Sequence, residues 1–280
     1  MMMGYKDILV HVNSSKHCGE RVDVALRLAR SFEAHLIGLY TASELYYPSY
    51  VAAQLPADLL LSQTRTMAEM RDRAKTAFED KTRASGINIE WREAKGEPAA
   101  MAAVHARYAD IAVFGQNDLD EALPDSDFDV PEAVILDSGR PILLVPYAGH
   151  FPKVGSRVMV AWNGSRQATR AVNDALPILK RAEQVIVIAV NPRKGAEGHG
   201  DVPGADLSLH LARHGVKAEA NHVFADDIAV GDMILSRAAD FGVDLIVMGA
   251  YGHTRLRETV LGGATRDLLE HMTVPVLMSH

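Results

Sequence analysis

The sequence predicts an α/β protein made of two tandem open sheets, each with about five parallel strands and with helices on both faces. Short, continuously apolar segments alternate along the chain with segments whose apolar residues recur at helical spacing. The segment DILVHVNSSKHCGERVDVALRLARSFEAHLIGLYT, from Asp7, matches RVMVAWNGSRQATRAVNDALPILKRAEQVIVIAVN, from Arg157, at a constant offset of 150 residues. The alternation indicates a parallel sheet, and the repeat indicates that the chain contains this unit twice.

In the first copy, residues 8–12 form a short β-branched strand, and Ser14 or Ser15 can cap the helix that follows. The apolar positions of that helix are Val22, Ala25, Leu26 and Ala29. A second apolar strand, HLIGLYT, follows it. The aromatic loop ELYYPSYVAAQLP then leads into a long helical pattern, which contains Leu60, Thr64, Met67, Ala74 and Phe78.

The second copy has the same order of elements but a shorter middle. Val158 and Val160 precede Asn163, and Ser165 is the expected cap of the next helix. Residues 195–215, which are rich in glycine, replace the long helical pattern of the first copy. Because the later matches have an offset of 134 residues, the first copy carries 16 additional residues in its middle.

Two later strands complete each copy. ADIAVFG, residues 109–115, matches VDLIVMG, residues 243–249, and RPILLVP, residues 140–146, matches VPVLMSH, residues 274–280. Between the copies, YAGHFPKVGS has the proline and glycine of a linker. We therefore expect one domain over residues 1–148 and a second over residues 156–280.

Composition excludes several classes of protein. The chain has 280 residues, of which 48% are hydrophobic and 23% charged, as in ordinary globular proteins. Its net charge of −7 argues against broad contact with nucleic acid or an anionic membrane. The segment MMMGYKDILVHV has too few apolar residues for a signal-peptide core or a membrane span, so the cytoplasm is the expected location. Cys18 is the single cysteine, which excludes an intrachain disulfide and zinc sites built on several thiolates.

The most informative segment is MGAYGHTRLRETVLGGATRDL, residues 248–268. Ligands of open parallel sheets bind beyond the carboxyl ends of the strands, where this segment begins. Gly249 at a strand end allows close approach to the backbone, and Gly252 allows a positive φ. Gly262 and Gly263 open a helix, whose free N–H groups favour an anion, and Thr265 adds a hydroxyl. The spacing therefore indicates a phosphate site, although it is neither a P-loop nor the dinucleotide GxGxxG motif.

Together with the repeat, this spacing closely resembles the universal stress protein family over nearly the whole chain. Members have an open, Rossmann-like α/β fold, and the nucleotide-binding branch uses a glycine, two residues, a glycine, nine residues, then a glycine followed by a small or hydroxyl residue. Gly249, Gly252 and Gly262 match this pattern, and Gly263 stands where Ser or Thr is commoner. Asn163 stands where the family usually has an Asp at the end of the first strand.

The resemblance implies that the second half binds ATP, or ADP or AMP, with an accompanying Mg²⁺ left open. The implied residues beside the nucleoside are Ala161, Asn163, Val190, Met248 and Gly249. The implied residues around the phosphates are Gly252, His253, Gly262, Gly263, Ala264 and Thr265. No residue is assigned a catalytic role.

The first half carries acids where the second carries glycines. Gly115 is retained, but Asp118 replaces the second glycine, and Phe128 and Asp129 replace the pair at the helix start. Two like charges 4 Å apart repel by about 1 kcal/mol in water and about 4 kcal/mol at a protein surface, so we expect no ATP here. The acidic loop, residues 118–129, is then either a solvated lid or a cation site.

Three functional hypotheses remain open. The first is a nucleotide-binding stress-response or regulatory protein, favoured because no Ser–His–Asp set or HExxH motif is evident. The second is a slow ATP hydrolase or self-phosphorylating protein, with Thr265 or Thr254 as the acceptor. The third is a scaffold that binds a small molecule other than a nucleotide.

The resemblance also implies how the two halves associate. Domains of this family commonly pair through their last strands, and both PILLVP and PVLMSH are apolar enough to need cover at a sheet edge. We expect residues 141–146 and 275–279 to lie side by side in an intramolecular pseudo-dimer. A homodimer of the whole chain is left open.

Overall fold

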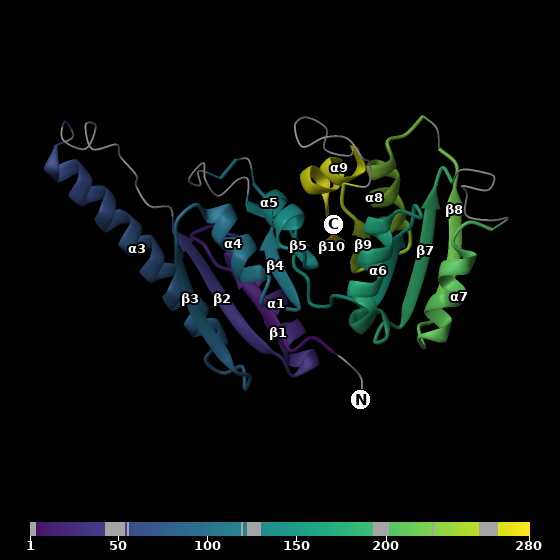
Figure 1. Ribbon diagram of the computed structural model, residues 1–280, viewed down its shortest axis with the longest axis horizontal. Helices are drawn as coiled ribbons and strands as arrows, with labels where there is room; N and C mark the ends of the chain where they lie inside the picture. Colours follow the sequence, from purple (N-terminus) through teal and green to yellow (C-terminus); the bar gives the residue numbers. More distant parts are fainter. Residues whose placement is uncertain are drawn as a thin grey trace.

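A computed structural model describes residues 4–42, 54, 56–118, 120–121, 130–192, 202–225, 227–251 and 263–280. Within these ranges, ten strands form one sheet in the order β3-β2-β1-β4-β5-β10-β9-β6-β7-β8, with helices on both faces (Figure 1). The predicted α/β fold with mostly parallel strands is confirmed, and the two expected sheets are joined into one.

The described strands and helices alternate in both halves. The first half contains β1 (Asp7–His11), α1 (Cys18–Phe32), β2 (His35–Ala42), α3 (Ala57–Thr82), β3 (Ile89–Lys95), α4 (Pro98–Ala106), β4 (Ile111–Gly115), α5 (Val130–Asp137) and β5 (Ile142–Val145). The second half contains β6 (Arg157–Ala161), α6 (Arg166–Leu179), β7 (Gln184–Val190), α7 (Ala205–Arg213), β8 (Ala218–Val223), α8 (Val230–Asp240), β9 (Leu245–Gly249), α9 (Gly263–His271) and β10 (Val276–Ser279).

The two first helices begin differently. Ser165 caps α6 as predicted, because its Oγ accepts a hydrogen bond of 3.1 Å from the N–H of Ala168. The predicted cap of α1 by Ser14 or Ser15 is wrong. Helix α1 begins after His17, without a side-chain cap bond. The Ser15 hydroxyl instead accepts from the N–H of His17 and donates to Glu121, so it is used by the loop before the helix.

The long helix α3 contacts the sheet through one end only. Of its 26 residues, Ala74, Phe78 and Thr82 are buried, and Figure 1 shows its amino-terminal part reaching away from the sheet. Phe78 lies directly over Gly38 of β2, where a Cβ would come within 2.6 Å of the aromatic ring. The missing side chain at Gly38 therefore lets the ring of Phe78 pack flat against the sheet.

The last strands of the two halves pair with each other. β5 and β10 run antiparallel, with Leu143 opposite Leu277 and Leu144 opposite Val276, as we predicted for these two segments. The apolar layers on both faces of the sheet contain buried residues from both halves, so the core is continuous across this pair. Near the seam, the Gln116 side-chain amide donates to the carbonyls of Leu269 and Glu270 in α9, at 3.0 Å each.

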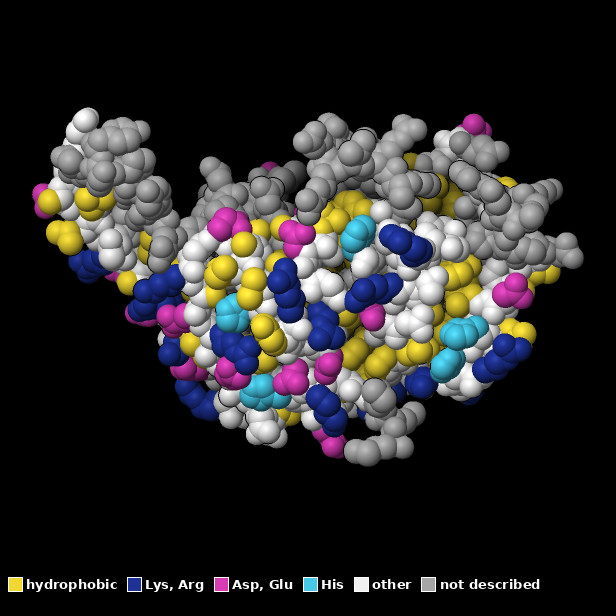
Figure 2. Space-filling view, in the orientation of Figure 1, with side chains coloured by type: hydrophobic (Ala, Val, Ile, Leu, Met, Phe, Trp, Pro, Cys, Tyr) yellow, Lys and Arg dark blue, Asp and Glu magenta, His cyan; other side chains and the backbone are white. Residues whose placement is uncertain are grey.

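The surface is mixed in character. On the face drawn in Figure 2, basic and acidic side chains are interspersed over the first half. Among the described helices, none combines the length and the apolar character that a bilayer crossing requires. These observations add no constraint on the partner of the protein.

The seam between β5 and β10 makes a first prediction about stability. Leu277 is fully buried at the centre of the pairing. Leu277→Ala should lower the free energy of unfolding by about 2–5 kcal/mol, because it leaves a cavity between the halves. Leu209→Ala, at a site on α7 that is 52% exposed, should change it by less than about 0.5 kcal/mol. Urea unfolding followed by tryptophan fluorescence measures both, and equal effects would contradict the role of the seam.

Candidate functional site

The crevice of the second half lies where the chain order reverses. β6 is flanked by β7 on one side and β9 on the other, and Ala161 at the end of β6 is paired with Met248 in β9. In the loop after β6, the Asn163 side-chain oxygen accepts a hydrogen bond of 3.1 Å from the N–H of Ser165. Asn163 therefore fixes the turn that places the start of α6 beside the crevice.

A cavity of about 70 Å³ opens at this point. It is lined by six of the residues predicted from the sequence, which are Ala161, Asn163, Val190, Met248, Gly249 and Ala264. The structure adds residues that the sequence analysis missed, namely Trp162, Ile188, Val230 and Ile234. The cavity is smaller than the roughly 300–1,000 Å³ of typical small-molecule sites, so a larger ligand would extend beyond it.

Two of the residues predicted to bind a ligand also have structural roles. A Cβ at Gly249 would lie 2.4 Å from the backbone nitrogen of Ala168, so this glycine allows the first turn of α6 to cross the end of β9. Thr265 is 3% exposed, and its Oγ1 accepts a hydrogen bond of 3.3 Å from the N–H of Tyr251. The Thr265 hydroxyl thus holds the end of β9 to α9, and it retains its own proton for one further hydrogen bond.

The start of α9 borders the same crevice. Ala264 lines the cavity, and Gly263 is exposed; among the described residues outside its own helix, no atom lies within 4 Å of the position that a Cβ would take. The N–H groups of the first helical turn, which an α-helix does not pair internally, lie at the edge of the cavity. The predicted residues Gly252, His253 and Gly262 lie outside the described residues.

The matching crevice of the first half is filled by its own side chains. Arg21, which stands where the second half has Ala171, is 6% exposed, and its Nη2 donates to Asn13 Oδ1 at 2.7 Å. A Cβ at Gly115 would lie 2.4 Å from Nη1 of Arg21, so the retained glycine makes room for the guanidinium. The space that remains here is about 20 Å³.

A buried histidine completes this filling. His11, which stands where the second half has Ala161, is 4% exposed, stacks on Phe114 at 5.2 Å between ring centroids, and lies 3.0 Å from Thr41 Oγ1. Burial, and secondarily the charge of Arg21, lower the pKa of His11 from 6.5 to about 3. The ring is therefore neutral near pH 7.

Comparisons with known proteins point to one protein family. A sequence model of the universal stress protein family matches residues 156–280. Universal stress protein MJ0577 of Methanocaldococcus jannaschii is 41% identical over 56 residues, covering 19% of this chain and 35% of that protein. Universal stress protein Slr1230 of Synechocystis sp. is 39% identical over 93 residues, covering 26% of this chain and 32% of that protein. Residues 156–280 belong to the universal stress protein family.

The tandem architecture also has a structural relative. A crystal structure of a universal stress protein from Archaeoglobus fulgidus superposes with a TM-score of 0.76 at 16% identity, covering 98% of this chain and 95% of that one. This likeness concerns the fold alone. The sequence matches span about a third of the length of the two curated relatives, so their activities and partners are not transferred here.

The acidic segment of the first half, residues 118–129, lies only partly within the described residues. The expectation of a solvated lid is wrong for Asp118, which is 7% exposed and lies 2.9 Å from both the Lys16 ammonium and His17 Nε2. The Lys16 bond, followed by the His17 bond, lowers the pKa of Asp118 to about 2. Glu121 accepts from Ser15 Oγ and from the Lys16 N–H, at 2.7 Å each. These two acids therefore tie the loop after β4 to the start of α1. Asp120 is exposed, and Asp125, Asp127 and Asp129 lie outside the described residues.

The same residues contain a group that could hold a metal ion. Side-chain ligand atoms of His17, Asp118 and Glu121 all lie within 4.8 Å of one another. The Lys16 ammonium already neutralises Asp118, and the guanidinium of Arg21 lies in the same crevice. A metal would therefore have to compete with these two cations, so the cluster carries no metal assignment.

Burial of His11 makes a prediction about pH. Its pKa is about 3 in the folded protein and 6.5 when unperturbed, so the unfolded chain takes up a proton that the folded protein does not. The free energy of unfolding should therefore fall as pH drops from about 6.5 towards 3. His11→Gln should flatten this slope between pH 6.5 and 4, above the range in which Asp118 protonates. Urea unfolding against pH measures it, with the exposed His214→Gln as the control that should keep the parent slope.

Proposed function

We propose that this universal stress protein binds one adenine nucleotide per chain, ATP or its product ADP or AMP, in the crevice of its second half. In this proposal residues 156–280 form the nucleotide-binding unit, and residues 1–148 form a degenerate unit that pairs with it. The protein would serve as a stress-response or regulatory protein of the cytoplasm. Its activity would then depend on which nucleotide occupies the crevice.

The asymmetry between the two crevices carries this proposal. In the second half, Ala161 and Val190 border a cavity that leads along Gly249 to the open start of α9. In the first half, Arg21 and His11 fill the corresponding space. A flat apolar base would fit between the small and aliphatic side chains, and the phosphates would extend towards the N–H groups of α9.

The residues present suit a nucleotide in two respects. The apolar lining from Ile188, Val230, Ile234 and Met248 supplies contacts for a base without demanding a particular hydrogen bond. The helix start at Gly263 supplies backbone donors, and no described side chain outside this helix lies within 4 Å of the place that a Cβ would take there. Burial of Thr265 does not favour the hypothesis that this residue accepts a phosphoryl group, and Thr254 lies outside the described residues.

A charge series at Gly263 tests where the phosphates bind. A side chain fits here without a clash, and an acid at a helix start stabilises the helix. Gly263→Asp should nevertheless weaken ATP binding by about five- to several-hundredfold, the equivalent of about 1–4 kcal/mol of repulsion. Gly263→Asn, of the same shape but uncharged, should lose much less.

Calorimetry with and without Mg²⁺ would give both affinity and stoichiometry. The parent should bind one nucleotide per chain. Two equivalent sites, or equal affinities for the Asp and Asn variants, would contradict the proposal. Product formation from ATP over hours, compared between the parent and Gly263→Asp, separates a binding protein from a slow hydrolase. A screen of other metabolites under the same conditions addresses the scaffold hypothesis.

Restoring the hydroxyl that is commoner in the family gives the opposite prediction. Gly263→Ser meets nothing within 4 Å and should leave the melting temperature nearly unchanged. A hydroxyl at this position can donate to a phosphate oxygen, and a hydrogen bond of this kind contributes about 0.5–1.5 kcal/mol. We expect an affinity about two- to tenfold higher than that of the parent, measured by the same calorimetry. Unchanged affinity for ATP together with unchanged affinity for adenosine would place the phosphates elsewhere.

A further inference from the structure

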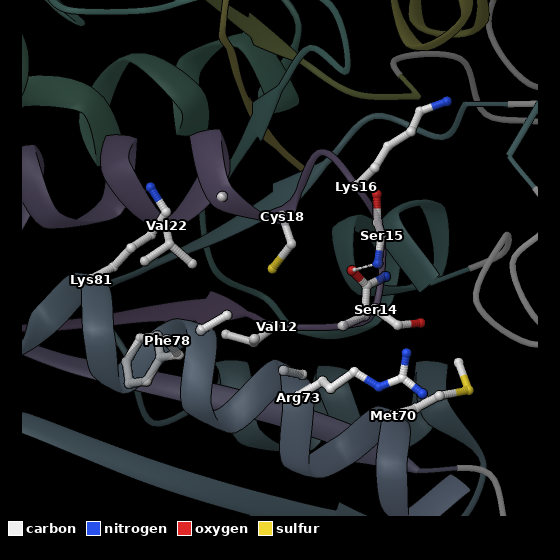
Figure 3. A pocket seen from close by; sticks show the side chains of 14 residues that line it. Val12, Ser14, Ser15, Lys16, Cys18, Val22, Met70, Arg73, Phe78 and Lys81 are labelled. Carbon is white, nitrogen blue, oxygen red and sulfur yellow. Dashed lines mark hydrogen bonds between the residues drawn. The ribbon is translucent and has the colours of Figure 1, made fainter. Parts of the chain in front are cut away.

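The first half contains a second cavity, of about 320 Å³, which shares the lining residues Asn13 and Ser15 with the filled crevice (Figure 3). It lies between α1, α3 and the loop after β1, and its volume is within the range of small-molecule sites. The long helix α3 forms one wall, and this helix belongs to the part of the first copy that is longer than its counterpart. The cavity therefore results from the same length difference that breaks the repeat.

The floor of the cavity is apolar. Val12 comes from the end of β1, Val22 from α1, and Met70, Ala74 and Phe78 from α3. Phe78 is 1% exposed and is held by Gly38 beneath it and Trp91 beside it, with 5.6 Å between the two ring centroids. The aromatic wall is thus fixed before any ligand arrives. Small side chains at Ala74 and Ala77 leave the space open.

The rim of the cavity is polar and carries cations without a carboxylate among the described lining residues. Two of the three cations are strongly paired elsewhere, Lys16 with Asp118 at 2.9 Å and Lys81 with Asp23 at 2.7 Å. Arg73 is held more weakly, since its Nη2 lies 3.6 Å from the Glu69 carboxylate, its Nε donates a long hydrogen bond of 3.3 Å to the Glu69 carbonyl, and its side chain is 76% exposed. Figure 3 shows Arg73 reaching from α3 towards the loop of Ser14 and Ser15.

We propose that this cavity binds a small amphipathic anion, with an apolar body of roughly eight carbons over Val12, Val22 and Phe78 and a carboxylate at Arg73. The guanidinium presents two parallel donors to a carboxylate, and the hydroxyl of Ser14 lies on the same rim. An uncharged molecule would gain only the apolar contacts of the cavity floor, and a cation would be repelled by the charge of Arg73. The site is independent of the nucleotide crevice.

Cys18 provides a reporter inside the cavity. Its side chain points into the space, as Figure 3 shows, and it is the only cysteine of the chain. A ligand over Val12 and Val22 would cover the thiol and slow its alkylation. The rate of alkylation by iodoacetamide therefore measures occupancy of this cavity.

The experiment compares octanoate with 1-octanol and octylammonium at the same concentrations, below micelle formation. Octanoate should slow the alkylation of Cys18 by at least about fivefold, because thiol reactivity follows access. The neutral and cationic chains should protect the thiol clearly less. Calorimetry with octanoate gives the affinity directly, also if the unliganded thiol reacts slowly. If octanoate gives neither protection of the thiol nor binding heat, the proposal is overturned.

Three variants identify the two ends of the site. Arg73→Gln should lower octanoate affinity by about tenfold through loss of a charge-assisted pair. Arg65→Gln is the matched control, because Arg65 lies on the same helix and pairs with the same Glu69 but does not line the cavity. Ala77→Phe, at an exposed position of the wall, should fill the space and abolish protection of Cys18. Parent-like binding by Ala77→Phe, or equal losses in the two arginine variants, would overturn the assignment.

Discussion

The antiparallel pair of β5 and β10 is the constraint on which the rest of the molecule depends. Each strand would be an apolar edge if its half stood alone, and an exposed apolar edge invites unwanted pairing. Joining the two edges covers both and makes the hydrophobic layers continuous from one half to the other. The halves therefore cannot move as independent domains without breaking a buried sheet. The features that distinguish one half from the other are all carried by this one continuous sheet.

Within that frame, a few side chains distinguish the described parts of the two crevices. Where the second half has Ala171 and Ala161, the first has Arg21 and His11. Among the described residues, the buried Nε of Arg21 has no hydrogen-bond partner, and such a group lowers stability unless its surroundings compensate. Acids in the same crevice bond to the start of α1 instead of facing solvent. Side chains of the first half thus occupy the space that the second half leaves open.

The sequence predicted the fold because short apolar segments and helical periodicity are local patterns that alternate along the chain. The repeat indicated two similar units, and the resemblance to the universal stress protein family implied that their last strands pair. Six site residues of the second half converge on one cavity because strand-end positions are fixed once the strands are known. Ile188 also lines the cavity, because it lies two residues before Val190 and both side chains are therefore on one face of β7.

Other features depend on contacts that no local pattern contains. Arg21 resembles a surface charge on an amphipathic helix, and its burial depends on Gly115, which lies far along the chain. Gly249 resembles a ligand-facing glycine, but its missing Cβ accommodates the backbone of α6. The start of α1 was misplaced because Ser15 is engaged by Glu121 in a distant loop. In each case a long-range partner decided between two uses of the same residue.

Helix α9 lies between the open crevice of the second half and a residue of the first half. Its first turn borders the open crevice, and the carbonyls of its last turn accept both hydrogen bonds from the Gln116 amide in the other half. Gln116 in turn directly follows Gly115, which accommodates Arg21. The helix is a strut between the two halves: a displacement at one end is transmitted to the other unless the Gln116 bonds break.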